Sequence, residues 1–262
     1  MEIRKTQALV LKREKYSESS QVITFLTPDR GRLICIAKGS RRSKSPFGDS
    51  LSLYAQAEII YYFQPYRVLQ TVTESDLEWF PWKIRVDPVR FIYASIFAEL
   101  LLGTVAGQTA DRTLFDLVAG GYKTIDRSPS SGLPALLWSL ELKLISALGY
   151  RPVLEHCVRC GEAVRSGRVS LDPAAGGLIC AKHADDSGTA LPLSIGSVRL
   201  LAGLLDLSLA KSIRHRAGEK MRSEIDSALS AFFEYHLGTA PRLDRLQMVN
   251  PVGRPTLPRG SV

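Results

Sequence analysis

The chain has 262 residues, of which 45% are hydrophobic and 23% are charged, so a disordered chain, a collagen-like repeat and a disulfide scaffold are excluded. At roughly 150 residues per domain, this length predicts about two domains. Thirty-four basic against 26 acidic residues give a net charge of +8, which favours partners such as nucleic acid, acidic protein tails or anionic membrane, although mild basicity can also serve solubility alone.

The first 80 residues have the alternating apolar pattern of half-buried strands. The sequence PDRG at 28–31 is typical of a tight turn, which would join two of the strands into a hairpin. Because closure removes exposed sheet edges, five short strands in so short a stretch predict a small barrel. The expected strands are residues 6–13, 20–27, 32–37, 51–63 and 68–75.

Helical spacing of apolar residues begins at residue 88, with Asp87 as the expected N-cap and Pro88 at the first helical position. Gly149 is the expected end of a later helix, with Pro152 beyond it. We therefore expect helices over residues 88–106, 112–125, 133–148, 197–210 and 219–236.

No segment predicts export or membrane insertion. Residues 1–7 are charged, and no apolar region with a small-residue cleavage site follows them. The most apolar stretch, residues 91–107, is short for a membrane span and contains Glu99. We expect a cytoplasmic protein whose thiols stay reduced.

These elements predict an α+β multidomain chain with an unevenly distributed charge. Residues 1–82 carry a net charge of +3, residues 83–150 and 195–237 carry +1 each, and the chain from residue 238 carries +3. The expected domains are a nucleic-acid-binding barrel (1–80), a helical domain in two parts (81–152 and 195–240), a metal-binding insert (153–194) and a flexible basic tail (241–262).

Three of the four cysteines cluster with a histidine in a pattern typical of a structural zinc site. Cys157 and Cys160 form one pair with two residues between them, and Cys180 and His183 form a second pair after 19 residues. A closed set of sulfur and nitrogen ligands leaves no open position for water, which favours structural over catalytic Zn²⁺.

Alternatives to this site remain. His156 competes with His183 for the fourth position, although its ring would have to fold back from the neighbouring Cys157. An iron–sulfur cluster prefers four thiolates, and a disulfide is disfavoured in a reducing compartment. Cys35 lies in an expected strand and is predicted to be ordinary core.

A basic loop, KGSRRSK at residues 38–44, joins two expected strands and contains four cations and no acid. Its glycine and serines keep the backbone flexible, so its side chains could follow a phosphate chain in a salt-dependent manner. Rings at positions 47, 54 and 61–63 could stack on bases, but most are expected to fill the barrel. The candidate nucleic-acid-binding residues are Lys38, Arg41, Arg42, Lys44, Arg32 and Arg13.

Motifs for catalysis are absent: there is no phosphate-loop, metalloprotease, nucleophile-elbow or dinucleotide fingerprint. We therefore expect no enzymatic activity and no catalytic residues.

Several sequence fragments, in this order, resemble the bacterial RecO family of recombination and repair proteins. They cover most of residues 1–240, and the combination is more specific than any one fragment. They are QALVL at 7–11, YSESSQVI at 16–23, TPDRGR at 27–32, AKGSRRSKS at 37–45, LGYRP at 148–152, CVRCG at 157–161 and GGLIC at 176–180.

This resemblance implies an N-terminal five-stranded OB-fold barrel, followed by a helical domain with an inserted zinc-ribbon-like module. It also implies a non-enzymatic mediator that binds single- and double-stranded DNA, anneals strands and helps RecA replace single-strand binding protein. The implied partners are RecR, the acidic C-terminal tail of single-strand binding protein and, indirectly, RecA. Members that keep the metal often have cysteine where this chain has His183, and some members have lost the ligands.

Two other hypotheses remain open at this stage. An OB-fold RNA-binding protein with a structural zinc would use the barrel and basic loop in the same way, but would read the 2′-hydroxyl. A zinc-dependent enzyme would need three protein ligands and a metal-bound water.

Overall fold

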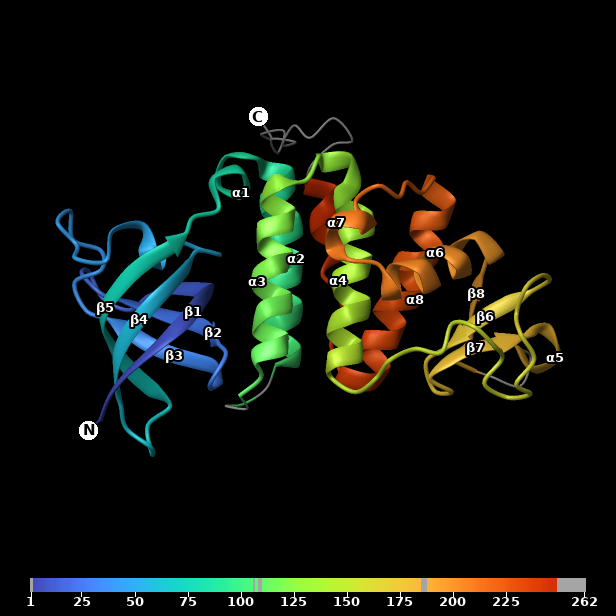
Figure 1. Cartoon of the computed structure of the whole chain (residues 1–262), viewed down its shortest axis with the longest axis horizontal. Coiled ribbons are helices and arrows are strands. Elements are labelled where there is room, and N and C mark those ends of the chain that lie inside the picture. Colours follow the sequence, from blue (N-terminus) through green and yellow to red (C-terminus); the bar gives the residue numbers. More distant parts are fainter. Residues whose placement is uncertain (1, 106, 108–109, 185–187, 249–262) are drawn as a thin grey trace, which may run out of the picture. The chain divides into compact units, whose positions relative to one another are not determined.

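The computed structural model describes residues 2–105, 107, 110–184 and 188–248 (Figure 1). The described chain forms two compact units. The first contains the N-terminal strands, helix α1 (Trp82–Val86), the end of α2 (Pro88–Thr104) and nearly all of α3 (Arg112–Arg127). The second contains the rest of α2 and the chain from Arg127 onward.

The N-terminal strands form a closed barrel in the order β1-β2-β3-β5-β4, which confirms the expected barrel. Every pairing is antiparallel except that of β3 with β5, which is parallel. Residues of β3 alternate between buried and half-buried, as one face packs into the barrel. The strands are β1 (Glu2–Lys15), β2 (Gln21–Thr27), β3 (Gly31–Ala37), β4 (Gln56–Phe63) and β5 (Leu69–Trp79).

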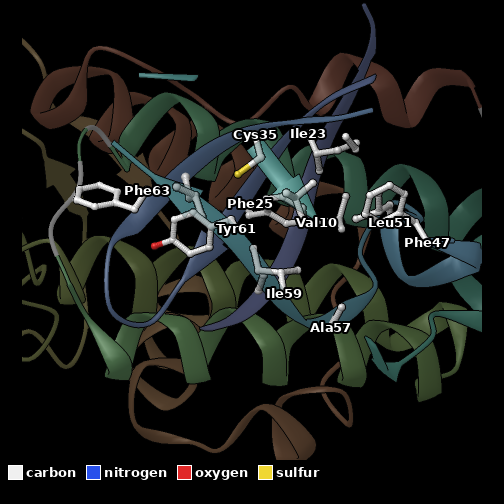
Figure 2. Close-up of a cluster of buried hydrophobic side chains, with 14 residues drawn as sticks. Val10, Ile23, Phe25, Cys35, Phe47, Leu51, Ala57, Ile59, Tyr61 and Phe63 are labelled. Carbon is white, nitrogen blue, oxygen red and sulfur yellow. The ribbon is translucent and has the colours of Figure 1, made fainter. Parts of the chain in front are cut away.

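Side chains from all five strands fill the barrel, and two residues of the β3–β4 connection join them (Figure 2). Phe47 and Leu51, which follow the basic loop, are buried in the same cluster as Phe25 and Tyr61. The barrel is therefore a packed core, and its connections supply part of the packing.

The expected strand over residues 51–63 was wrong in its first five residues. The 3₁₀ helix η1 (Gly48–Leu51) stands at its start, and Tyr54 adopts a left-handed φ of 66° before β4 begins. The Tyr54 ring stacks on that of Tyr122 in α3, with ring centroids 4.9 Å apart. Burial of the Tyr54 ring stabilises this strained backbone conformation. The strand propensity of residues 51–55 does not indicate such tertiary packing.

The first long helix begins where its cap predicts. The Asp87 Oδ1 atom accepts hydrogen bonds from the N–H groups of Val89 at 2.9 Å and Arg90 at 3.3 Å. In α4 (Leu133–Ala147), most side chains are buried, and the chain leaves this helix through Gly149 at a φ of 94°.

The single helix expected over residues 197–210 was wrong, because two helices occupy this stretch. Helix α6 (Ile195–Asp206) ends before Leu207 and Ser208, which are both extended, and α7 (Leu209–Ser212) follows. The apolar periodicity continues across this break, so it did not reveal it. Helix α8 (Glu219–Leu237) completes the helical core.

The insert forms a small three-stranded sheet in the order β7-β6-β8. Strands β6 (Val169–Asp172) and β7 (Gly177–Cys180) form a hairpin whose turn contains Gly176 at a φ of 76°, and α5 (Ala181–Ala184) follows directly. Strand β8 (Leu191–Leu193) pairs with β6 and leads toward α6.

The expected tail over residues 241–262 begins with ordered structure, which corrects its expected start. The 3₁₀ helix η3 (Leu243–Met248) lies there, and Arg245 forms an ion pair with Glu99 of α2. Residues 249–262 of the expected tail lie outside the described residues. Of the helices in the described ranges, none has the length and hydrophobicity needed to cross a membrane.

Candidate nucleic-acid interface and metal centre

The basic loop projects from the end of β3 and leaves all four of its cationic side chains exposed. The strand register aligns Lys15 with Gln21 and Gln21 with Ala37, so the loop lies at the same barrel end as the β1–β2 turn. Within the described chain, no acidic side chain forms an ion pair with any of the four: Lys38, Arg41, Arg42 and Lys44. Their charge is therefore available to a polyanion.

Hydrogen bonds shape the loop more than its glycine and serine content predicts. Gly39 takes a φ of 73°, and the Arg42 N–H donates to its carbonyl at 3.1 Å. The Ser45 N–H donates to the Arg42 carbonyl, also at 3.1 Å. These bonds form two successive turns, which present the cations on a defined backbone.

Arg41 differs from the other three cations of the basic loop because it forms hydrogen bonds to the β1–β2 turn. Its N–H donates to the Ser19 carbonyl at 3.1 Å, and its Nη1 donates to the carbonyls of Ser17 at 3.0 Å and Glu18 at 3.3 Å. Arg41 therefore ties the basic loop to the β1–β2 turn. Lys38, Arg42 and Lys44 make no such side-chain bonds to the described residues.

The two remaining predicted cations lie at opposite ends of the barrel. Arg13 is two positions from Lys15 on β1, and its Nη2 donates to the Gln21 Oε1 at 3.1 Å. Burial and the neighbouring Arg85 guanidinium lower the pKa of Arg13, and the Asp49 carboxylate, which pairs with Arg85, opposes this shift.

Arg32 stands at the start of β3, the far end from the loop. Its Nη1 donates to the Leu102 carbonyl at 3.0 Å, near the C-terminal end of α2. This bond satisfies one of the carbonyls that a helix end leaves unpaired. The structure therefore brings Arg13 toward the basic loop and does not bring Arg32 there.

The rings considered for base stacking mostly fill the barrel, as expected. Phe47, Tyr54, Tyr61 and Phe63 are all buried. The exposed ring beside the basic loop is instead Tyr16, which is 61% exposed in the same turn that Arg41 contacts. Sequence reasoning missed Tyr16, although its position between two expected strands was a usable signal.

The second feature is the cluster of Cys157, Cys160, Cys180 and His183, whose ligand atoms all lie within 4.8 Å of one another. Cys160 Sγ is 3.9 Å from Cys180 Sγ, and the His183 Nδ1 is 3.3 Å from Cys180 Sγ and 3.8 Å from Cys157 Sγ. A tetrahedral Zn²⁺ with bonds of about 2.3 Å to sulfur and about 2.0 Å to nitrogen separates its ligand atoms by about 3.5–3.8 Å. The four residues therefore fit a metal ion of this kind.

The electrostatics of the cluster favour a bound cation. Burial raises the pKa of the Cys157 thiol, but the N–H groups of Cys180, Cys160 and Arg159 and the Cys160 thiol together lower it to about 6. A thiolate at this buried position is the form that binds metal. His156, the rival ligand, is exposed and lies outside the cluster.

Comparisons with known proteins match most of the chain. The family model described as "Recombination protein O N terminal" matches residues 1–79, and "Recombination protein O C terminal" matches residues 85–245. The DNA repair protein RecO of Symbiobacterium thermophilum is 30% identical over 237 residues, covering 88% of this chain and 91% of that protein. The DNA repair protein RecO of Anaeromyxobacter dehalogenans strain 2CP-1 is 30% identical over 253 residues, covering 97% of this chain and 98% of that protein.

Proposed function

The chain belongs to the RecO family, whose relatives are DNA repair proteins, and we propose that it is a non-enzymatic recombination mediator that binds and anneals DNA strands. In this proposal, residues 1–80 are an OB-fold domain that binds single- and double-stranded DNA. The helical parts, residues 81–152 and 195–240, carry the insert and partner-binding surfaces.

One observation carries the DNA-binding part of the proposal: the basic loop presents Lys38, Arg42 and Lys44 to solvent, and none of them pairs with an acid of the described residues. Each phosphate that such a cation neutralises releases counterions, which gives binding without sequence preference. Arg13 extends the cationic surface, and Tyr16 offers a ring on which a base can stack. Arg41 holds the surface in place.

Annealing follows from the same charge. A basic surface lowers the repulsion between two polyanionic strands and raises their local concentration. No reacting group is needed for this step, which agrees with a mediator that performs no covalent chemistry.

The proposed partners are those that the family resemblance implies. They are RecR, the C-terminal tail of single-strand binding protein and, indirectly, RecA, which the mediator helps to load on coated DNA. These partners place the proposed site of action at the nucleoid in the cytoplasm.

The proposed cofactor is a structural Zn²⁺ held by Cys157, Cys160, Cys180 and His183. With four protein ligands, the ion supplies folding energy to the insert and has no open position for a substrate. The insert then serves as a scaffold beside the helical core.

The salt dependence of single-stranded DNA binding tests the proposal. The variant Lys38→Glu with Arg42→Glu leaves the Arg41 tether in place, and we expect the log–log salt slope to become less steep by about 1.4 for two lost phosphate contacts. The variant Arg165→Glu with Arg168→Glu makes the same charge change at exposed positions of the insert and serves as the control.

Replacing the Tyr16 ring tests base stacking independently of the charge contacts. We expect Tyr16→Ala to cost about 1–3 kcal/mol of binding free energy for one lost stack, with no change in salt slope. An unchanged slope in the Lys38 and Arg42 variant, with the control also unchanged, would remove the basic loop from the interface.

A further inference from the structure

The second compact unit, which contains α4, α6, α7 and α8 and which we call the helical unit, carries a second cationic surface that its net charge does not reveal. Residues 195–237 carry a net charge of only +1, but residues 208–222 carry +4 and residues 223–237 carry −3. The positive half spans α7, the turn after it and the start of α8. We call it the α7–α8 basic cluster, which consists of Lys211, Arg214, Arg216, Lys220 and Arg222.

All five cations of the cluster are exposed, and none forms an ion pair within the described part of the chain. Glu219 is the one acid among them in the sequence. Two further acids lie nearby on α8. Glu224 accepts hydrogen bonds from the Ser197 hydroxyl at 2.6 Å and the Ser194 N–H at 3.0 Å, and Asp226 accepts one from the Trp138 Nε1–H at 2.6 Å. Glu224 and Asp226 interact electrostatically with Lys220 and Arg222, so the charge is partly balanced at the start of α8. Lys211, Arg214 and Arg216 form no ion pair with the described residues, and their charge stays available.

Close packing against the start of α4 holds the cluster in place. A Cβ atom on Gly132 would lie 2.6 Å from the Ile213 carbonyl oxygen, so the two backbones meet where only glycine fits. The Arg216 Nη2 donates to the Ser131 Oγ at 3.0 Å beside this contact. Packing of this kind presents the surrounding cations on a rigid support.

The composition of the surface indicates which polyanion it suits. No large hydrophobic side chain is exposed between residues 208 and 222 in the described structure. A protein partner usually adds aromatic or apolar anchors to its charge contacts, and the described part of this surface exposes no large hydrophobic side chain to receive them. A nucleic-acid backbone needs only accessible cations.

We propose that the α7–α8 basic cluster is a second phosphate-binding surface, which holds a nucleic-acid strand independently of the basic loop on the barrel. This inference rests on the proposed function, because it assigns the second strand of an annealing pair to the helical unit. One protein chain then binds two nucleic-acid strands at once. Pairing of these strands takes place on one protein molecule, where each strand has a high effective concentration relative to the other.

A stoichiometric titration of the full chain with a labelled oligothymidylate of about 12 nucleotides, in the range of one OB-fold site, tests this. The cluster variant is Arg214→Glu with Lys220→Glu, and the loop variant is Lys38→Glu with Arg42→Glu. Arg165→Glu with Arg168→Glu is the matched control. We expect two oligomers per chain for wild type and control, and one for either double variant.

Annealing of complementary oligomers gives the second readout. We expect the cluster variant to anneal about tenfold more slowly than the control at low salt, because two phosphate contacts are lost. The milder variant Arg214→Gln with Lys220→Gln should give an intermediate rate, and it keeps the test valid if charge reversal near Glu219 and Glu224 unfolds α8.

The outcomes separate this inference from the proposed function. A wild-type chain that binds one oligomer, or a cluster variant that matches the control in stoichiometry and annealing, overturns the second surface and leaves the loop assignment standing. Binding of poly-glutamate that only the cluster variant loses, with unchanged oligomer binding, overturns it in favour of an acidic protein partner. A wild-type chain that binds no oligomer overturns the proposed function itself.

Discussion

Replacing Gly177 with alanine should detach half of the metal site without changing any ligand. Gly177 begins β7 and forms a parallel bridge with Val153. A Cβ atom there would lie 2.6 Å from the Val153 carbonyl oxygen, 2.7 Å from the Val153 Cβ and 2.8 Å from the Val158 Cγ1. Two of these three atoms are backbone or Cβ atoms that cannot rotate away, so the segment from Val153 to Val158 must move.

That segment carries Cys157, which makes the displacement costly. The Leu178 N–H donates to the Val153 carbonyl at 2.9 Å, and the Val158 N–H donates to the Leu178 carbonyl at 2.8 Å. The Cys180 N–H donates to the Cys157 Sγ at 3.4 Å. These bonds bring the first ligand pair to the second.

The expected cost combines two contributions. Overpacking costs about 1–3 kcal/mol, and weakening two backbone hydrogen bonds adds about 1 kcal/mol each at most. A total of about 3 kcal/mol corresponds to a loss of about 100-fold in metal affinity.

Competition with a colorimetric zinc chelator measures this affinity, and hydrogen exchange over residues 153–180 reports the detachment. Gly188→Ala is the control, because a Cβ atom at this position of the same insert meets nothing within 4 Å. If the Gly177→Ala protein retains zinc as tightly as the Gly188→Ala protein does, the proposed coupling between the bridge and the metal site is wrong.

Three further predictions concern single side chains. Cys157→Ser should abolish the expected one equivalent of bound zinc in metal analysis, whereas Cys35→Ser, a buried cysteine of the barrel, should keep it. Burial, and then the charge of Asp226, raise the pKa of Glu141 well above 4.5, so the folded state favours the protonated form, and stability falls as pH rises above that value. Glu141→Gln should therefore flatten this decline and stabilise the protein in urea unfolding at about pH 8 relative to about pH 5, and an unaltered pH profile would count against it. Asp126→Ala removes a carboxylate that accepts from two N–H groups at the start of α1, at 2.8 and 2.9 Å, and should cost about 1–2 kcal/mol in urea unfolding.

The barrel and the metal cluster could be predicted because their signals are local. Alternation with period two marks the strands, and the two-residue gap within each ligand pair turns both side chains toward one point. The Asp87 cap is likewise a feature of three consecutive residues.

The differences arise where long-range packing decides the local structure. Residues 51–55 are apolar enough for a strand, but Leu51 is buried in the barrel core. Tyr54 stacks on Tyr122 of α3, which is nearly 70 residues later in the chain. Arg32 has the composition of a DNA contact, yet its guanidinium bonds the end of α2. Neither partner can be identified from neighbouring residues.

Exposure and charge segregation were the other features hidden in the sequence. Tyr16 lies in the turn between β1 and β2 and is exposed, whereas Phe47, Tyr61 and Phe63 are buried in the barrel core. The net charge of residues 195–237 does not reveal the α7–α8 basic cluster, because α8 is basic at its start and acidic beyond it.

The central claim is that the basic loop captures DNA strands by charge so that they can pair. Annealing of complementary strands already coated with single-strand binding protein tests it most directly. We expect the wild-type chain and the Arg165→Glu, Arg168→Glu control to pair the coated strands, and the Lys38→Glu, Arg42→Glu variant to fail. Pairing by that variant at the control rate, with its fold intact by circular dichroism, would contradict the account.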